Sequence, residues 1–200
     1  MGVRCGLGEL TTIWHRAAMP YEPPPDLAGL TLAEVAEQVR LRKLPPVESW
    51  TPQKSGDSAM RIAADGTWSH EGSPIARHAM VRAFSGLLTR DDAGQHWLVT
   101  PFEKLSIEVE DAAFIAVDVA QKQGDLAFRL NTDELVVAGP DHALHARGDA
   151  DTPAIYLHVR RGCEARINRS TWQQLVDIAM AQGDDWSVSS GGETFALVPQ

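Results

Sequence analysis

The sequence lacks the residues that small proteins use to cross-link themselves or to hold a structural metal. Its 200 residues include two cysteines, Cys5 and Cys163, and neither has a CxxC neighbour. This spacing argues against a zinc knuckle or a redox pair. A chain of this length buries roughly 70% of its unfolded surface and needs no such staple. We therefore expect a reduced, cytoplasmic protein.

Long apolar runs are also missing. No run approaches the roughly 20 residues that cross a bilayer, so we expect no membrane partner. Gly, Glu and Thr interrupt the segment after Arg4, which therefore does not resemble a signal peptide. Residues 1–18 show no sustained period, and we predict a flexible N-terminal arm over residues 1–26. A chain that started at Met19 would lose little predicted structure.

Positive charge is scarce, because 18 Lys and Arg residues against 27 Asp and Glu residues give a net charge of −9. This sign argues against nonspecific binding of nucleic acid. The charge is unevenly spread, since residues 101–150 contain ten acidic and four basic residues. Residues 160–169 instead contain four arginines and one acidic residue, Glu164. That basic cluster suits a small anionic ligand.

The sequence contains no recognised catalytic or metal-binding motif. There is no P-loop and no G-x-G-x-x-G after a predicted strand. Ser73 precedes a proline and lacks the G-x-S-x-G elbow of hydrolases. Glu108 and Glu110 lack the tight acidic loop that binds calcium, and His142 and His145 fall in a predicted loop rather than on a helix. We therefore expect no metal, no cofactor and no catalytic residue.

A mixed pattern of helices and strands predicts an α+β fold. Thr31 and Glu34 form a capping box before a helix that runs to about Lys43. The dipeptide Asp65-Gly66 stands between short alternating runs and predicts a hairpin. Further strands are predicted over residues 97–100, 105–109, 114–119, 126–130, 134–138, 154–159 and 163–167, with a terminal hairpin over residues 186–198.

Two more helices are predicted from apolar residues at helical spacing. One helix carries a stripe from Met80 to Leu88, with Phe84 facing the core and Arg90 at its solvated end. The other runs from about Ser170 to Ala181, and Ser170 forms its capping box with Gln173.

The hairpin-then-helix pattern occurs twice. Ile75-Ala-Arg77 precedes one helix, and Ile167-Asn-Arg169 precedes the other. We predict internally duplicated hairpin-plus-helix units over residues 60–88 and 154–181, with Arg77 and Arg169 at equivalent places. The match is short, and chance is the alternative, because hairpin followed by helix is a common unit.

This pattern also suggests a division of the chain. After the arm over residues 1–26, residues 27–95 are expected to form an N-terminal α+β half. Residues 96–200 are expected to form a β-rich C-terminal half that is closed by its helix.

Four segments resemble the signature of one bacterial family. They are residues 60–77 (MRIAADGTWSHEGSPIAR), 81–85 (VRAFS), 98–104 (LVTPFEK) and 109–112 (VEDA). The chain is similar, from about Pro45 to Gln182, to the uncharacterised proteobacterial domain-of-unknown-function family twelve eighty-five. Two residues depart from the pattern, Phe102 in place of a valine and Ala113 in place of a proline.

The resemblance implies a duplicated α+β core whose C-terminal half is like a pleckstrin-homology fold, a bent antiparallel sheet or barrel closed by a helix. It also implies a ligand site between the two halves for a nucleotide-like molecule, and a role in signalling. It brings no established activity and no catalytic residues.

Arg77 and Lys104 are the first candidates for contact with an anion. Both stand at the boundary of a predicted element, where side chains converge on clefts. Arginine offers a planar fork for phosphate or carboxylate, and lysine offers a compact positive charge. The alternative is that Arg77 covers its own helix and pairs with Glu71 or Asp65.

The other candidates are His70, Glu103, Asn131 and Arg169. A His70-Glu71 dyad is disfavoured, because adjacent residues on a strand point to opposite faces. Asn131 lies in a turn at the expected rim of the cleft, and Arg169 begins the last helix.

These features predict a noncatalytic protein that binds a small anionic, nucleotide-like ligand between its halves, where Arg77 and Lys104 face one cleft. Two alternatives stay open. One is a module that binds a protein or peptide, and the other is an enzyme for a nucleotide-like substrate with His70 or Glu103 as its base. The sequence does not set the oligomeric state.

Overall fold

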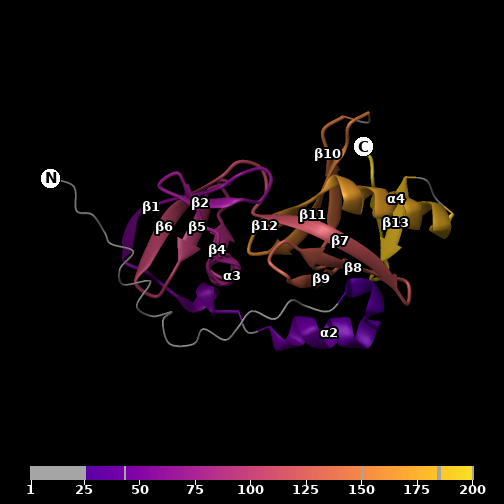
Figure 1. Cartoon of the computed structure of the whole chain (residues 1–200), viewed down its shortest axis with the longest axis horizontal. Coiled ribbons are helices and arrows are strands. Elements are labelled where there is room, and N and C mark those ends of the chain that lie inside the picture. The colour runs from indigo at the N-terminus through magenta and orange to yellow at the C-terminus, as the bar shows by residue number, and fades with distance from the viewer. Residues whose placement is uncertain (1–25, 43, 150, 184–185, 200) are drawn as a thin grey trace.

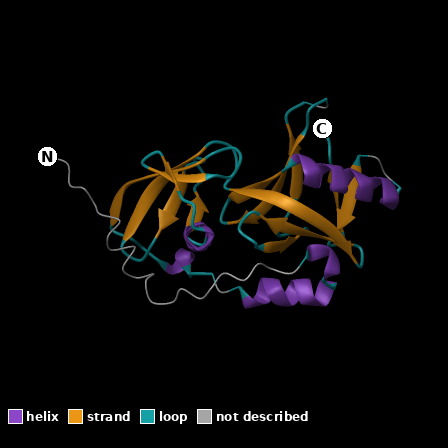
Figure 2. Cartoon of the chain, viewed as in Figure 1, coloured by secondary structure: helices purple, strands orange, loops and turns teal. Residues whose placement is uncertain are grey.

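The computed structural model describes residues 26–42, 44–149, 151–183 and 186–199. Two six-stranded sheets lie side by side along the long axis, and helices flank them (Figures 1 and 2). The predicted α+β class is therefore confirmed. The expected arm lies outside the described residues except for Asp26, as do Cys5 and Met19. Within the described ranges, no helix is long and apolar enough to cross a membrane.

The first sheet has the strand order β3-β2-β1-β6-β5-β4. The chain runs outward from the centre to one edge, crosses through a helix, and returns from the other edge to the centre. Its first and last strands therefore lie in the middle as a parallel pair. The elements are β1 (Lys54–Ile62), β2 (Trp68–His70), β3 (Ser73–Pro74), α3 (His78–Ser85), β4 (Leu88–Arg90), β5 (His96–Val99) and β6 (Glu103–Val109).

The second sheet has the order β10-β11-β12-β7-β8-β9, with the parallel pair β12 and β7 at its centre. A helix and a separate hairpin follow it, so the predicted terminal hairpin is confirmed. The elements are β7 (Phe114–Lys122), β8 (Asp125–Leu130), β9 (Leu135–Val137), β10 (Leu144–Arg147), β11 (Ala154–Arg160), β12 (Cys163–Ile167), α4 (Arg169–Gln182), β13 (Ser187–Ser190) and β14 (Glu193–Ala196).

The two sheets repeat one strand order, so the chain is internally duplicated, but not in the predicted way. The repeat relates β1–β6 to β7–β12, strand by strand. The predicted repeat instead matched β1–β2 and α3 to β11–β12 and α4. It is wrong because the first hairpin runs outward from the central strand, whereas the second runs inward to it. Arg77 and Arg169 therefore do not occupy equivalent places.

The sheets meet between Val109 and Phe114. The division expected at residue 95 separates strands of one sheet, because β4, which precedes it, and β5, which follows it, pair within the first sheet. The predicted cap of α4 also differs. Asn168, not Ser170, accepts the hydrogen bond from the Thr171 N–H at 2.8 Å.

The N-terminal segment packs on the second sheet. It comprises a short 3-10 helix, η1 (Leu27–Gly29), and α2 (Leu32–Leu41), and α2 has the predicted capping box of Thr31 and Glu34. Val35 is its fully buried residue and clusters with Leu27 and with Ala127 and Leu135 of β8 and β9. This segment therefore reaches past the first sheet, and Figure 1 shows α2 beside β9.

One continuous core joins the two sheets. It contains residues of both halves, including Ile62 and Leu88 from the first and Phe114 and Leu157 from the second. Phe84 of α3 is buried, as predicted, and stacks on the buried ring of Trp68, with ring centroids 6.5 Å apart. Arg90 lies on β4 and not at the end of the helix, because α3 ends at Ser85.

We predict that Phe84→Ala lowers the free energy of unfolding by about 3–5 kcal/mol, because it leaves a cavity beside Trp68. Arg90→Ala is the control, since Arg90 is exposed, and it should change stability by no more than about 0.5 kcal/mol. Urea unfolding measures both. Equal midpoints for the two variants would contradict the packing described for α3.

Candidate functional site

The two halves touch at the turn after β1. Asp65 Oδ1 accepts a hydrogen bond from Thr67 N at 2.9 Å, and Gly66 has a φ of +82°. These are the predicted turn roles. A Cβ added to Gly66 would lie 2.6 Å from Asn131 Nδ2 and 2.8 Å from Ile115 Cγ1. Only glycine allows this approach of the first half to the second.

Neither Arg77 nor Lys104 lines any of the three main hollows of the described chain. Lys104 lies near the start of β6, where its Nζ sits 4.1 Å from the centroid of the Trp97 ring. Arg77 precedes His78, whose Nε2 is 3.1 Å from the carbonyl oxygen of Asn131 in the second half. The end of β6 that approaches the second half is about 16 Å farther along the strand than Lys104.

The other predicted residues are dispersed as well. His70 ends β2, where it pairs with Met60 and Ser73. Glu103 begins β6, and its N–H donates to Thr100 Oγ1 at 3.1 Å. Asn131 and Arg169 are the pair that meets, because both line the hollow at the start of α4.

This α4 hollow has a volume of about 520 Å³ and lies between the turn at residues 64–65 and the second sheet. Trp172 forms part of its wall, and Arg166 and Arg169 lie at its rim. Arg166 pairs with Asp111 at 2.6 Å, so its charge is compensated. Positive charge left for an anion therefore comes from Arg169.

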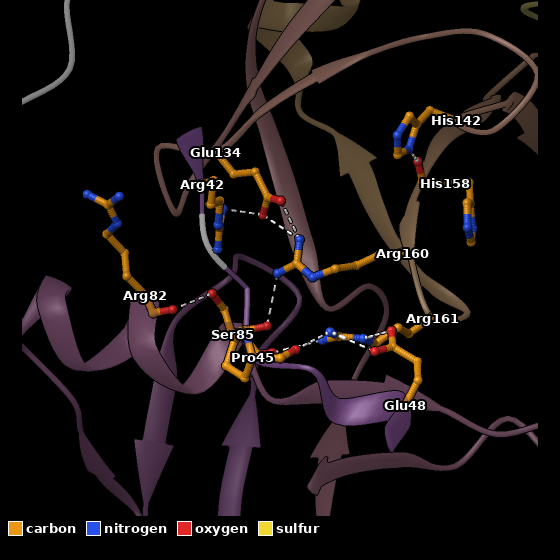
Figure 3. A network of polar contacts seen from close by, with 11 residues as sticks. Arg42, Pro45, Glu48, Arg82, Ser85, Glu134, His142, His158, Arg160 and Arg161 are labelled. Atoms are coloured by element: carbon orange, nitrogen blue, oxygen red, sulfur yellow. Dashed lines mark hydrogen bonds and ion pairs between the residues drawn. The ribbon is translucent and has the colours of Figure 1, made fainter. Parts of the chain in front are cut away.

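A second contact between the halves is built by arginines, and the sequence did not identify it. Arg160, at the end of β11, has Nη1 2.5 Å from both carboxylate oxygens of Glu134. Its Nη2 donates to the Ser85 carbonyl at 3.0 Å. Arg42, just after α2, pairs with the same carboxylate. One acidic residue thus joins three segments of the chain (Figure 3).

Arg161 adds a second clamp beside the first (Figure 3). Its guanidinium donates to the carbonyls of Gly86 at 2.9 Å and Pro45 at 2.7 Å, and it forms an ion pair with Glu48. Arg161 has a φ of +50°, in the left-handed region, because it forms the turn between β11 and β12 with Gly162. The turn of the second sheet is thereby fixed to the loop after α3.

Next to these clamps lies a hollow of about 380 Å³, which we call the arginine hollow. Among the described residues, four arginines but only two carboxylates line it. Its charged lining residues are Arg42, Arg82, Arg129, Arg160, Asp133 and Glu134.

The pKa of Arg42 reflects its burial and the charges around it. Burial, the largest cause, lowers the pKa of Arg42 to about 10. The attraction of Glu134 opposes this shift, whereas repulsion from Arg160 and Arg82 adds to it. An anion in the hollow would offset the repulsion between these guanidinium groups.

A third group of ionisable residues crosses β10, β11 and β12. His145 Nε2 lies 3.1 Å from Glu164, which also pairs with Arg147 at 2.7 Å. Burial lowers the pKa of His145 despite this carboxylate. Neither His145 nor Glu164 lines either hollow described above. In the described part of the chain, no three His, Cys, Asp or Glu residues are placed to hold a metal ion.

Comparison with known proteins identifies a family that matches this chain. The N-terminal domain of the domain of unknown function DUF1285 matches residues 45–112, and the C-terminal domain of the protein of unknown function DUF1285 matches residues 113–197. The two matches divide the chain where the two sheets meet. Among curated proteins, none matches this sequence.

Two crystal structures are similar to this chain. A DUF1285 family protein from Silicibacter pomeroyi is 37% identical with a TM-score of 0.68, over 82% of this chain and 94% of that chain. A DUF1285 family protein from Shewanella baltica is 24% identical with a TM-score of 0.50, over 60% of this chain and 91% of that chain. The second likeness concerns the fold alone.

The contact at Gly66 gives a prediction with a matched control. Gly66→Ala and Gly72→Ala both place alanine at a positive φ, near +80°, which costs about 1–2 kcal/mol. The Cβ at Gly72 meets nothing within 4 Å, whereas the Cβ at Gly66 would push the halves apart at a further cost of about 1–3 kcal/mol. Equal urea midpoints for the two variants would show that the turn does not press on the second half.

The shared carboxylate gives another prediction. Glu134→Gln should destabilise the protein by about 3–5 kcal/mol, because it leaves the guanidinium groups of Arg42 and Arg160 without their common acid. Glu37→Gln is the control, since Glu37 has one exposed ion pair, with Arg40. Thermal unfolding measures the difference, and a loss no larger than that of the control would mean that Glu134 does not hold the three segments.

Proposed function

Because the chain belongs to the DUF1285 family, whose name assigns no activity, we propose a function from the geometry of its own site. The protein binds a small anionic ligand in the arginine hollow. The hollow lies where α2, α3 and the second sheet meet, and thus between the two halves. The observation that carries this proposal is the excess of guanidinium groups over carboxylates at that point.

The proposed binding is noncatalytic. His142 is the ring with a titratable nitrogen in the described lining of the arginine hollow, and its Nδ1 lies 3.1 Å from the His158 carbonyl oxygen. Catalysis of acyl or phosphoryl transfer uses a nucleophile held beside its base. The described lining of this hollow contains no Ser, Thr or Cys to fill that role.

We also propose that the second half works as a pleckstrin-homology-like module in cytoplasmic signalling. In support, α4 follows the last strand and packs on the sheet, where the Gln174 amide donates to Asp118 Oδ1 at 3.0 Å. A ligand bound between the halves would be sensed by both, since Arg82 comes from α3 and Arg129 from β8.

A second candidate site is the α4 hollow, which has features that a nucleotide-like ligand would use. Trp172 offers a flat face for a base, and Asn131 offers an amide for hydrogen bonds. Arg169 supplies the charge for a phosphate. We rank it second because two arginines line it, whereas four line the arginine hollow.

Arg82→Ala tests the proposal. The side chain of Arg82 is 40% exposed, and its Nη1 lies 3.9 Å from Asp133 Oδ2, so its loss should leave the melting temperature nearly unchanged. We predict that inorganic phosphate binds at least about tenfold more weakly, because one charge-assisted hydrogen bond is lost.

Calorimetric titration of the purified chain measures this effect. Arg40→Ala is the matched control, because Arg40 lies on α2, is 72% exposed and pairs with Glu37, but does not line the hollow. Phosphate that bound equally to the wild type and to both variants, or to none of them, would contradict the proposal.

A further inference from the structure

The lining of the arginine hollow combines two chemically different groups of side chains. One group is the guanidinium groups of Arg42, Arg82, Arg129 and Arg160. The other group is aliphatic, and we call it the aliphatic wall. It consists of Leu30, Val39, Leu41, Leu44, Leu135, Val136 and Val159.

The aliphatic wall contains unusually exposed side chains. Val39 is 41% exposed and Leu41 is 57% exposed, although both line the hollow. Val35, one turn earlier on the same helix, is fully buried against the second sheet. The last turn of α2 therefore holds large apolar side chains in contact with water at the rim of a charged hollow, where a ligand could cover them.

The lining also distinguishes between ligands. A nucleobase is usually held against an aromatic face. In the described lining of the arginine hollow, the single ring is that of His142, and no Phe, Tyr or Trp is present. Branched aliphatic side chains instead suit a flexible hydrocarbon chain, whose contact with them is nondirectional.

We propose that the ligand of the arginine hollow is an amphiphile, a short aliphatic chain that ends in a carboxylate or phosphate. This inference rests on the proposed function, because the anionic head takes the place for which the guanidinium groups are assembled. The hydrocarbon chain of the ligand lies along Val39 and Leu41. Leu30, Val39, Leu41 and Leu44 precede the segment matched by the family model, which begins at residue 45. Selectivity for the hydrocarbon chain of the ligand therefore belongs to this N-terminal segment.

The test is a calorimetric series on the full chain with inorganic phosphate, butyl, hexyl and octyl phosphate, octanoate and adenosine monophosphate. The dissociation constant should fall roughly fourfold for each CH₂ that covers the aliphatic wall. Adenosine monophosphate should bind no more tightly than butyl phosphate. Octanoate and octyl phosphate separate the two head groups, and tight binding of either one supports the proposal.

Leu41→Ser tests the wall directly. Leu41 is exposed, so the variant should fold, and it should weaken octyl phosphate about tenfold or more while leaving inorganic phosphate unchanged. Met180→Ser is the matched control, because Met180 is 61% exposed and does not line the hollow.

The outcomes separate this inference from the proposed function. Phosphate binding with no dependence on chain length, or tighter binding of adenosine monophosphate than of octyl phosphate, overturns the amphiphile and leaves the anion site standing. Equal weakening of octyl phosphate by Leu41→Ser and Met180→Ser also overturns it. Failure of every phosphate and of octanoate to bind overturns both.

Discussion

The carboxylate of Glu134 is the interaction on which the assembly of this protein depends. It accepts from Arg160 of the second sheet and pairs with Arg42 of the N-terminal segment, while Arg160 also binds the backbone of Ser85 at the end of α3. Removing ions from water is costly, so such a cluster is held only where several groups share the compensation. Here one acid serves two cations. In the described lining of the hollow beside it, guanidinium groups outnumber carboxylates, and a place suited to an anion follows from the way the segments are joined.

The strand order of the two sheets shows how a duplication can diverge. In both sheets the polypeptide runs from the centre to one edge and then returns from the other edge to the centre. The helices differ, since α3 lies between the two runs of the first half, whereas α4 follows the second half as a whole. The first half thus places its helix, and with it Arg82 and Ser85, against the second sheet. Asymmetry in the helices, rather than in the strands, creates the junction between the halves.

Local features of the fold were predictable from the sequence. The capping box at Thr31, the turn at Gly66 and the inward face of α3 at Phe84 each depend on neighbouring residues, and the structure has all three. The strand pairing was not predictable, because hairpin spacing does not say which strands become central. The arginine hollow was not predictable either. The sequence drew attention to the cluster at residues 160–169, but Arg42, Arg82 and Arg129 reach Arg160 from three separate elements. Arg77 and Lys104 were chosen for standing at element boundaries, a property that carries no information about long-range position.

The parallel pair at the centre of each sheet has a consequence for the order of folding. The strands β1 and β6 are neighbours although four strands and a helix separate them in the sequence. Contacts between residues that are distant in the sequence form slowly, because the entropy of closing a long loop is lost before the contacts contribute stabilising free energy. On the ribosome, β1 therefore waits with an unpaired side until β6 emerges, and the second sheet repeats the delay between β7 and β12. Each half therefore completes its centre last, when β6 or β12 pairs with the strand that began that half.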